Sequence, residues 1–353
     1  MLGRQGKCTH YAVHLTTANQ SEIRRAYLVS VLKWRIVVIT FGIMGAGNIA
    51  HGLCGAVRLM EDAKVGAVAS RDLARSQDFA RREHIDRAYG NYQQLLEDPS
   101  IDCVYIATIT SLHYEHVMMC LEAGKAVLCE KPMACTPQQA RRMTALAREK
   151  GLFLMEGMWT RFLPKTRKVR EWIGQGRIGH VELVQGTVGF VAPTDPASRL
   201  NAPELGGGVF YDLGVYLIDL IPYLVGQKIQ DLQAWVKQGT TGVDETVNLN
   251  MKLEDCMANA QMTFRAITPE DVYIYGDQGY IRIPKIHWGR GAMLYGPGDE
   301  LIEEFYEEMP EGFYYEVQEV VRCLKQGLTE SETASHAMTL EAAEIYERFV
   351  PKV

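Results

Sequence analysis

The chain has 353 residues, and its 47% hydrophobic and 23% charged content is typical of a globular protein. This length exceeds the usual size of one domain, so two domains are expected. A net charge of −6 without a dense basic stripe argues against nucleic acid as a partner. Eight cysteines with no Cys-x-x-Cys pair are typical of reduced thiols, which predicts a cytoplasmic protein.

Residues 1–36 precede the first recognisable element, and we predict that they form an extension of unknown role. The apolar stretch at 27–44 contains Lys33 and Arg35, whereas a spanning helix needs about 20 nearly uncharged residues. No small-residue cleavage site follows the stretch, which argues against a secretory signal. We therefore expect no association with a membrane.

The first half of the chain predicts alternating strands and helices. Strands are expected at residues 39–44, 64–70, 102–108, 125–130 and 152–158, and helices at 48–60, 73–83, 113–124 and 137–151. Short strands separated by helices of about 12 residues are typical of right-handed βαβ units in a parallel sheet. The fold class is therefore α/β, with residues 37–158 forming a doubly wound, dinucleotide-binding Rossmann domain.

The pattern changes after about residue 160, where strands follow one another through short turns. Strands are expected at residues 180–190, 231–239, 245–253, 258–266, 271–276 and 279–284. A helical C-terminus is expected from about Gly312. Residues 159–353 are thus predicted to form a second α/β domain with a mostly antiparallel sheet, for substrate binding and oligomerisation.

A glycine-rich turn follows the first predicted strand. Gly45, Gly47 and Ala50 match G-x-G-x-x-[G/A], in which the glycines permit a tight turn and close approach of a pyrophosphate. The phosphates would lie against the helix N-terminus, beside Asn48 and Ile49. An ordinary glycine-rich turn is the alternative, but the position at the start of a βαβ series favours a dinucleotide site.

The end of the second strand indicates which dinucleotide binds. An acidic residue there would bind the ribose hydroxyls of NAD, but this strand ends in Ser70 followed by Arg71. A serine and an arginine can hold a 2′-phosphate, the arginine through charge-assisted hydrogen bonds. This favours NADP, although Arg71 is also consistent with a solvated residue at a helix start.

Two further motifs carry chemistry. Glu130, Lys131 and Pro132 follow a buried strand, at the edge of a parallel sheet where ligands bind. Asp212 and Tyr216 follow three glycines in GGGVFYDLGVY and are spaced i, i+4, so they share one face of a predicted helix.

Together these motifs resemble the glucose–fructose oxidoreductase and inositol dehydrogenase (Gfo/Idh/MocA) family. Within it, the likeness is strongest to the dimeric dihydrodiol dehydrogenases and the NADP-dependent xylose dehydrogenases. The resemblance runs from about residue 40 to the C-terminus, through GIMGAGNIA, ASRDL, SLHYEHVMMCLEAGKAVLCEKPMA, EGMWTRFLP, GGGVFYDLGVY and VYIYGDQGYIRIP. It implies a Rossmann domain followed by an α/β domain with an open, largely antiparallel sheet.

The resemblance also implies roles for single residues. Lys131 would lie near the nicotinamide and the substrate hydroxyl, with Asp212 and Tyr216 completing the catalytic group. The expected cofactor-binding residues are Gly45, Gly47, Asn48, Ile49, Ser70, Arg71, Thr108, Thr110, His113, Glu130, Lys131 and Trp159. One departure concerns the family's Ala-Thr-Pro-Asn loop, which here has Ile109 and Thr110 in place of proline and asparagine.

The implied catalytic residues suit hydride transfer. Oxidation of a carbinol carbon requires a base within hydrogen-bond reach of its hydroxyl. Tyrosine ordinarily titrates at about 10, and a nearby ammonium and an oxidised nicotinamide both favour the phenolate. We therefore expect Tyr216 to be the acid/base, Lys131 its electrostatic partner and Asp212 an orienting or substrate-binding group.

The expected function is NADP-dependent oxidation or reduction of a hydroxyl carbon in a sugar, polyol or cyclic diol, with NAD possible as cofactor. The alternative is a non-catalytic NAD(P)-binding sensor or scaffold, because a fold does not fix a function. The pair Lys131 and Tyr216 favours the enzyme, since a sensor does not need it.

Two expectations concern metals and assembly. His113, His116 and Cys120 share one face of a predicted helix, but one helix rarely supplies three converging ligands, so no metal is expected. A homodimer or higher homo-oligomer is expected through the open face of the second sheet. The strands at 245–253 and 258–266 are predicted to alternate imperfectly, with apolar residues on both faces, which fits partial burial by a partner.

Overall fold

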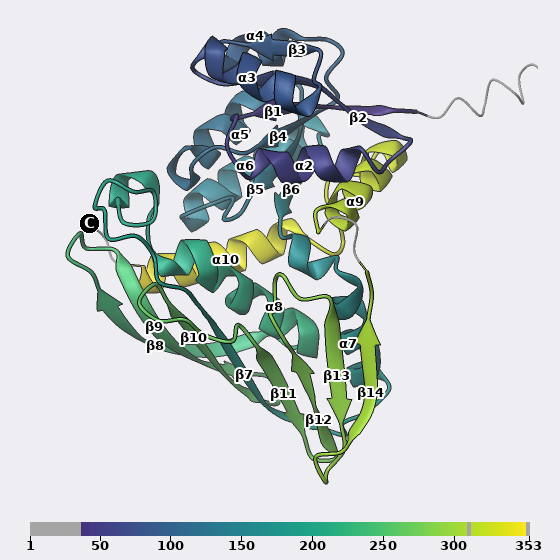
Figure 1. Cartoon of the computed structure of the whole chain (residues 1–353), viewed down its shortest axis with the longest axis vertical. Helices are drawn as coiled ribbons and strands as arrows, with labels where there is room; N and C mark the ends of the chain where they lie inside the picture. The colour runs from purple at the N-terminus through teal and green to yellow at the C-terminus, as the bar shows by residue number, and fades with distance from the viewer. Residues whose placement is uncertain (1–36, 309–311, 351–353) are drawn as a thin grey trace, which may run out of the picture. The chain divides into compact units, whose positions relative to one another are not determined.

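The computed structural model describes residues 37–308 and 312–350, and residues from Val38 onward form one compact unit (Figure 1). The predicted extension at residues 1–36 lies outside the described residues. The compact unit contains two sheets, one in each half of the chain, and helices that pack on them.

The first sheet has six parallel strands in the order β3-β2-β1-β4-β5-β6, which is the doubly wound order of a Rossmann fold. Its strands are β1 (Ile39–Met44), β2 (Ala63–Ala69), β3 (Arg87–Tyr89), β4 (Cys103–Ile106), β5 (Ala126–Glu130) and β6 (Leu154–Gly157). Its helices are α2 (Ala50–Val57), α3 (Leu73–Glu83), α4 (Tyr92–Glu97), α5 (His113–Glu122) and α6 (Pro137–Lys150). The predicted fold class is confirmed, but β3 and α4 were not predicted.

Helices cover both faces of this sheet, because successive residues of its strands enter two separate cores. In β4, Cys103 and Tyr105 pack into the core that contains α2, whereas Val104 and Ile106 pack into the core that contains α5 and α6. Burial on both faces explains why these strands are continuous apolar runs.

Local signals in the sequence set the ends of the long helices. The Thr136 side chain accepts a hydrogen bond from the Gln139 amide and caps the start of α6, where Pro137 occupies the first turn. Gly151 ends the same helix with a left-handed φ of 64°.

The second sheet has eight strands in the order β14-β13-β12-β11-β7-β10-β9-β8. Among the described residues its pairings are antiparallel except that of β7 with β10, so the mostly antiparallel prediction is confirmed. The strands are β7 (Val181–Gly189), β8 (Ile229–Gln238), β9 (Asp244–Leu253), β10 (Met257–Thr263), β11 (Val272–Gly276), β12 (Gly279–Ile283), β13 (Gly291–Tyr295) and β14 (Leu301–Tyr306). Strands β13 and β14 were not predicted.

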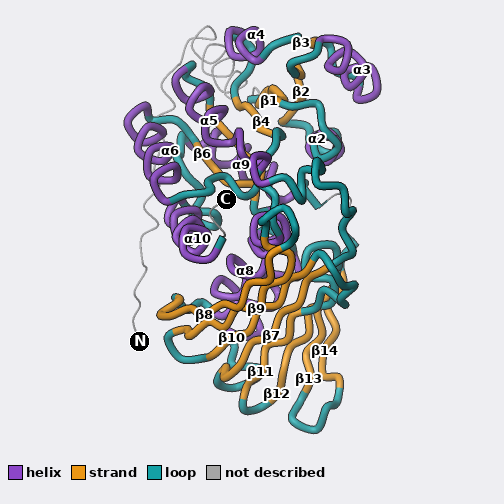
Figure 2. The backbone as a smooth tube through the Cα atoms, turned by 90° about the vertical axis from the view of Figure 1, so that its left-hand side faces the viewer, coloured by secondary structure: helices purple, strands orange, loops and turns teal. Residues whose placement is uncertain are grey.

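The helices of the second half are α7 (Pro164–Gly174), α8 (Val215–Val225), α9 (Tyr314–Gln326) and α10 (His336–Phe349). Helix α8 packs on β7 and β10, and α7 packs on β13 and β14. Helix α10 contacts both α6 and α8, so it joins the two halves (Figures 1 and 2). The helical stretch Pro203–Val225 is long and apolar enough to cross a membrane, but 72% of its apolar window is buried in the protein, as in a core helix.

The face of the second sheet that points away from its helices is more polar than the sequence predicts. In β9, Val247, Leu249 and Met251 are buried, whereas the alternating Asn248 and Asn250 both accept hydrogen bonds from the Asn259 side chain in β10, each at 2.7 Å. The expectation that these two strands carry apolar residues on both faces is therefore wrong, because their alternation places the apolar residues in the core.

Candidate active site

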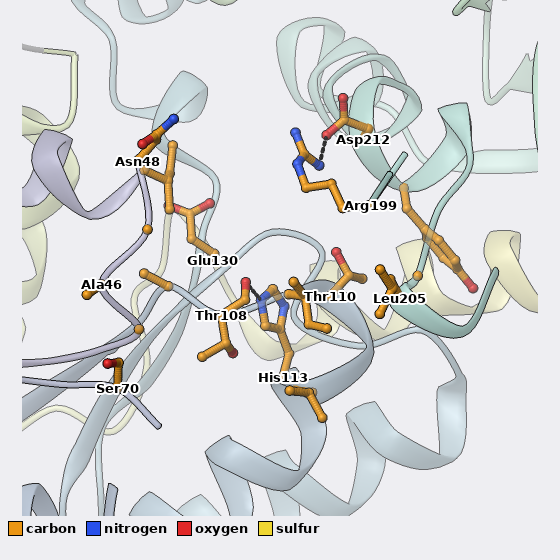
Figure 3. Close-up of a pocket in the computed structure, with 18 of the residues that line it drawn as sticks. Ala46, Asn48, Ser70, Thr108, Thr110, His113, Glu130, Arg199, Leu205 and Asp212 are labelled. Carbon is orange, nitrogen blue, oxygen red and sulfur yellow. Dashed lines mark hydrogen bonds and ion pairs between the residues drawn. The ribbon is translucent and has the colours of Figure 1, made fainter. Parts of the chain in front are cut away.

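A cavity of about 740 Å³ lies at the carboxyl edge of the first sheet (Figure 3). It is lined by loops that follow β1, β2, β4 and β5, and by residues 199–212 of the second half. This is the edge of an open α/β sheet at which ligands bind. The predicted residues that line it are Gly45, Gly47, Asn48, Ile49, Ser70, Arg71, Thr108, Thr110, His113, Glu130, Lys131 and Asp212.

The glycine loop after β1 has the geometry that a pyrophosphate requires. Gly45 has a φ of +109°, and a Cβ atom there would lie 2.8 Å from the Ala107 carbonyl oxygen. Within the described residues no side chain caps the N-terminus of α2. Its amide end and the glycine backbone are thus suited to hold phosphate groups.

The loop after β2 and the first turn of α3 each bring an arginine to the cavity. Arg71 is exposed, and Arg75, which was not predicted, donates from its Nε to the Ala46 carbonyl at 3.1 Å. The Ser70 hydroxyl is buried and bonded within its own turn, to the Asp72 carbonyl at 2.7 Å. The Asp72 carboxylate accepts from the Ala74 amide and caps α3.

The loop after β4 is fixed to the loop after β5 by a buried histidine. His113 approaches the Pro132 carbonyl with Nδ1 at 2.8 Å and the Thr108 carbonyl with Nε2 at 3.1 Å. Burial, chiefly, lowers the pKa of His113, and the contacts with the two carbonyls oppose this. Ile109 and Thr110, which depart from the family loop, still line the cavity.

Glu130 and Lys131 lie where β5 ends. The Glu130 carboxylate accepts from the Tyr105 hydroxyl at 2.5 Å and from the Lys131 amide at 3.2 Å. Burial raises the pKa of Glu130, and these hydrogen bonds and the Lys131 charge oppose the rise.

Lys131 joins the two halves of the site. Its Nζ donates to the Asp212 carbonyl at 2.6 Å, lies 4.0 Å from the Asp212 carboxylate and lies 4.6 Å from the centre of the Tyr216 ring. Burial alone would lower the pKa of Lys131, but the negative charges available on Tyr216, Asp212 and Glu130 outweigh it and raise the pKa. The ammonium is therefore maintained beside the phenol.

The Asp212 carboxylate also pairs with Arg199 at 2.9 Å, a cavity residue that was not predicted (Figure 3). Burial would raise the pKa of Asp212, but Lys131 and Arg199 together lower it. Asp212 therefore stays ionised between two cations.

Tyr216 and Trp159 lie beside the cavity lining rather than in it. Tyr216 is 7% exposed, and its hydroxyl accepts a hydrogen bond from Trp159 Nε1 at 3.5 Å. Burial raises the pKa of Tyr216, and Lys131 and the Trp159 bond oppose the rise without cancelling it. The expected lowering by Lys131 is present but smaller than the effect of burial, so the free protein holds a protonated phenol at neutral pH.

A short π-helical segment, Phe210–Gly214, places Asp212 immediately before α8. The Asp244 carboxylate accepts from the Phe210 amide at 2.7 Å and fixes the start of this segment. Segments of this kind are frequent at functional sites.

A third residue that the sequence did not reveal, after Arg75 and Arg199, is His287, whose ring stacks on Tyr216 with centroids 4.8 Å apart and planes 2° apart. The loop that carries it follows β12 and has no motif of its own. Among the described residues, no group of three His, Cys, Asp or Glu side chains is arranged as metal ligands are.

A Rossmann sheet with a glycine-lined cavity at its carboxyl edge, facing a second domain with a large mixed sheet, is the architecture of a dinucleotide-dependent oxidoreductase. Residues 39–158 match the model of an oxidoreductase family with an NAD-binding Rossmann fold, and residues 166–282 match the model of the Gfo/Idh/MocA C-terminal domain. The chain belongs to the Gfo/Idh/MocA oxidoreductase family, and a nicotinamide dinucleotide is its cofactor class.

Similar proteins include trans-1,2-dihydrobenzene-1,2-diol dehydrogenases. That of Danio rerio is 35% identical over 88% of this chain and 95% of its own length, and that of Sus scrofa is 34% identical over 88% and 96%. Among solved structures, an aldose–aldose oxidoreductase from Caulobacter crescentus (22% identity, TM-score 0.80) and an NADP complex of a 3-ketoreductase from Actinomadura kijaniata (24% identity, TM-score 0.79) share the fold, each over 88% of this chain and 96% of the other.

Proposed function

We propose that this protein is an NADP-dependent dehydrogenase or reductase that acts on a hydroxyl carbon of a cyclic diol, polyol or sugar. The observation that carries the proposal is the contact of Lys131 Nζ with both the Asp212 carbonyl and the Tyr216 ring at the edge of the dinucleotide cavity. This arrangement places a proton-carrying phenol, a fixed ammonium and a carboxylate together, as removal or return of a hydroxyl proton requires.

In this proposal, the cavity residues would hold a nicotinamide dinucleotide, which would supply the hydride chemistry. As the phenolate, Tyr216 takes the proton of the substrate hydroxyl during oxidation, and as the phenol it donates a proton during reduction, exchanging its hydrogen bond with Trp159 for one with the substrate. Lys131 stabilises the phenolate and the developing alkoxide electrostatically. Asp212, held by Arg199, orients Lys131 and is available to a second substrate hydroxyl.

The preference for NADP is supported by the residues beside the turn after β2. Arg71 and Arg75 both line the cavity there, whereas the Asp72 carboxylate, which lines it beside them, accepts from the Ala74 amide and caps α3. Two guanidinium groups favour a 2′-phosphate over free ribose hydroxyls. Gly45, Gly47, Asn48 and Ile49 would hold the pyrophosphate.

The substrate class is supported by the diol dehydrogenases at up to 35% identity. The substrate in their name, a dihydrobenzene diol, is a ring with adjacent hydroxyls, which the carboxylate of Asp212 and the phenol of Tyr216 suit chemically. Sugars and polyols present the same grouping.

We further propose a cytoplasmic homodimer formed through the open face of the second sheet, with domains at 37–158 and 159–353. Tyrosines lie opposite one another on neighbouring strands of that face, with Tyr280 and Tyr295 centroids 4.6 Å apart. Leu183, which is 44% exposed, lies opposite Tyr275 on the next strand. Aromatic residues of this kind are enriched in protein interfaces. The described cysteines are free, which suits a reducing compartment.

The proposed activity is tested by a screen of cyclic diols, pentoses, hexoses and inositols with NADP and with NAD. The absorbance of the reduced nucleotide measures the rate of oxidation and the rate of reduction. We expect turnover with at least one diol or sugar and a higher kcat/KM with NADP. Tight nucleotide binding without turnover of any compound would instead support a sensor or scaffold.

A further inference from the structure

Tyr216 has a second aromatic neighbour besides Trp159. The imidazole of His287 lies parallel to its phenol ring, and His287 is only 4% exposed. Its Nδ1 is buried without a hydrogen-bond partner among the described residues. The histidine therefore contacts Tyr216 through its ring face rather than through a polar bond.

The loop that carries His287 is held in an unusual conformation. Lys285 has a φ of +46° and Glu270, which faces the loop, has a φ of +60°. Residues other than glycine rarely adopt a positive φ, and such a backbone conformation is maintained only where surrounding contacts impose it. The Ile286 amide bonds the Glu270 carbonyl at 2.7 Å and supplies one such contact.

A buried lysine supplies another contact. Lys165 of α7 is 1% exposed, and its Nζ donates to the Lys285 carbonyl at 3.1 Å. Burial lowers the pKa of Lys165 to about 7, opposed by Asp271. Its hydrogen bond holds the backbone at Lys285, two residues before His287.

The charged groups near His287 keep its ring neutral. Lys131 and Lys165 add to burial in lowering its pKa to about 4, and Asp212 opposes them. Glu270 lies 4.0 Å from its Nε2. A neutral imidazole packs on the phenol without competing with Lys131 as the cation of the site.

We propose that His287 is a positioning residue for the acid/base, holding the Tyr216 phenol in place and dry by ring stacking from a loop that Lys165 anchors. This inference rests on the proposed role of Tyr216. The position of the phenol matters because displacing a reacting group by about 1 Å can slow the reaction by about 100-fold.

The test compares His287→Ala, which removes the ring, with His287→Phe, which keeps an aromatic face but no nitrogen. His51→Ala is the matched control, since His51 stacks on Phe79 with centroids 4.6 Å apart outside the cavity lining. The measurements are kcat, KM, nucleotide affinity, and the titration of Tyr216 by tyrosinate difference absorbance, with Tyr216→Phe as the blank.

We expect His287→Ala to lower kcat by about 10- to 100-fold with nucleotide affinity unchanged. The Tyr216 titration should move toward lower pH, because water entering the vacated space removes part of the burial that raises its pKa. His287→Phe should restore most of the lost rate and return the titration toward that of the wild type. His51→Ala should change neither.

The inference is overturned if His287→Ala keeps normal kcat and titration, or if His287→Phe is as damaged as His287→Ala. If His287→Ala does not fold, Lys165→Met provides the same test, since it loses the bond to the Lys285 carbonyl but keeps an apolar stem. It should then lower kcat and shift the titration in the same direction. A near-normal rate in Tyr216→Phe would instead disprove the proposed function itself.

Discussion

The Lys131 ammonium lies among three groups that can each carry a negative charge. Glu130 precedes it, Asp212 lies 4.0 Å away and the Tyr216 ring lies 4.6 Å away. Glu130 and Asp212 both raise the pKa of Tyr216, so they offset part of the lowering by Lys131. This explains why burial still raises the pKa of Tyr216 in the free protein.

A pH dependence follows from this balance. Oxidation needs the phenolate, and the raised pKa of Tyr216 keeps the free phenol protonated at neutral pH. We expect kcat/KM for oxidation to increase from acid toward alkaline pH, and kcat/KM for reduction to fall only on the alkaline side. Initial rates in both directions across pH check this, and an oxidation rate that is flat or falls with pH would contradict it.

Arg71 should discriminate between the two nucleotides. A charge-assisted bond to a 2′-phosphate is worth about 1.5–3 kcal/mol, so Arg71→Ala should weaken NADP by roughly tenfold to a hundredfold and NAD little. Fluorescence titration with both nucleotides measures this. Arg82→Ala is the matched control, because Arg82 pairs with Asp78 on α3 outside the cavity lining. Equal losses for NADP and NAD in Arg71→Ala would show that Arg71 does not bind the phosphate.

The site residues that lie in sequence motifs could be predicted from the sequence. The others reach the site only through contacts between residues far apart in the chain. Lys131, Asp212 and Arg71 each lie in a recognisable pattern and reach the cavity. Arg199 and His287 come from loops without a motif, and only the tertiary fold brings them to Asp212 and Tyr216.

At the scale of elements, the glycine loop between β1 and α2 leaves no room for a side chain at Gly45. Gly45 combines a φ of +109° with only 2.8 Å between a would-be Cβ and the Ala107 carbonyl oxygen. Strain of this kind costs about 1–3 kcal/mol, and relieving the clash would displace the phosphate-binding backbone.

Gly45→Ala should therefore lower thermal stability and weaken nucleotide binding by at least about tenfold. Gly151→Ala is the control, since Gly151 has a φ of +64° but open space around its Cα among the described residues. It should show a stability loss of about 1–2 kcal/mol with normal nucleotide affinity. Thermal melts and nucleotide titrations compare the two. Identical behaviour of the two variants would refute the steric account.

Helices and strands could be predicted where capping residues and the spacing of apolar residues both marked them in the sequence. Helix α3 was predicted with its observed ends, because Asp72 caps its start and its apolar residues are periodic. Helix α7 was missed since its sequence is rich in charge, and the burial of Lys165 and Thr166 within it depends on the second sheet. Strand β3 has three half-buried residues and too little pattern to recognise.

For the whole molecule, we expect a dimer of twice 39.7 kDa by light scattering at micromolar concentration. Leu183→Arg should yield monomers, because it places a charge among the tyrosines of the open sheet face. Leu59→Arg is the control, as Leu59 is exposed to a similar degree, 49%, but follows α2 in the first half. A wild-type protein that is monomeric at these concentrations would rule out the proposed assembly.

The central claim is that Lys131 and Tyr216 act as one acid/base unit, and a double-mutant cycle tests it most directly. Lys131→Met, Tyr216→Phe and the double variant are compared by kcat, with NADP affinity measured alongside. We expect each single variant to lose at least ~100-fold in kcat while still binding NADP. The double variant should be little worse than the more damaged single one, because coupled residues are not additive. Near-normal turnover in Tyr216→Phe, or fully multiplicative losses, would contradict the account and direct attention to Asp212 as the base.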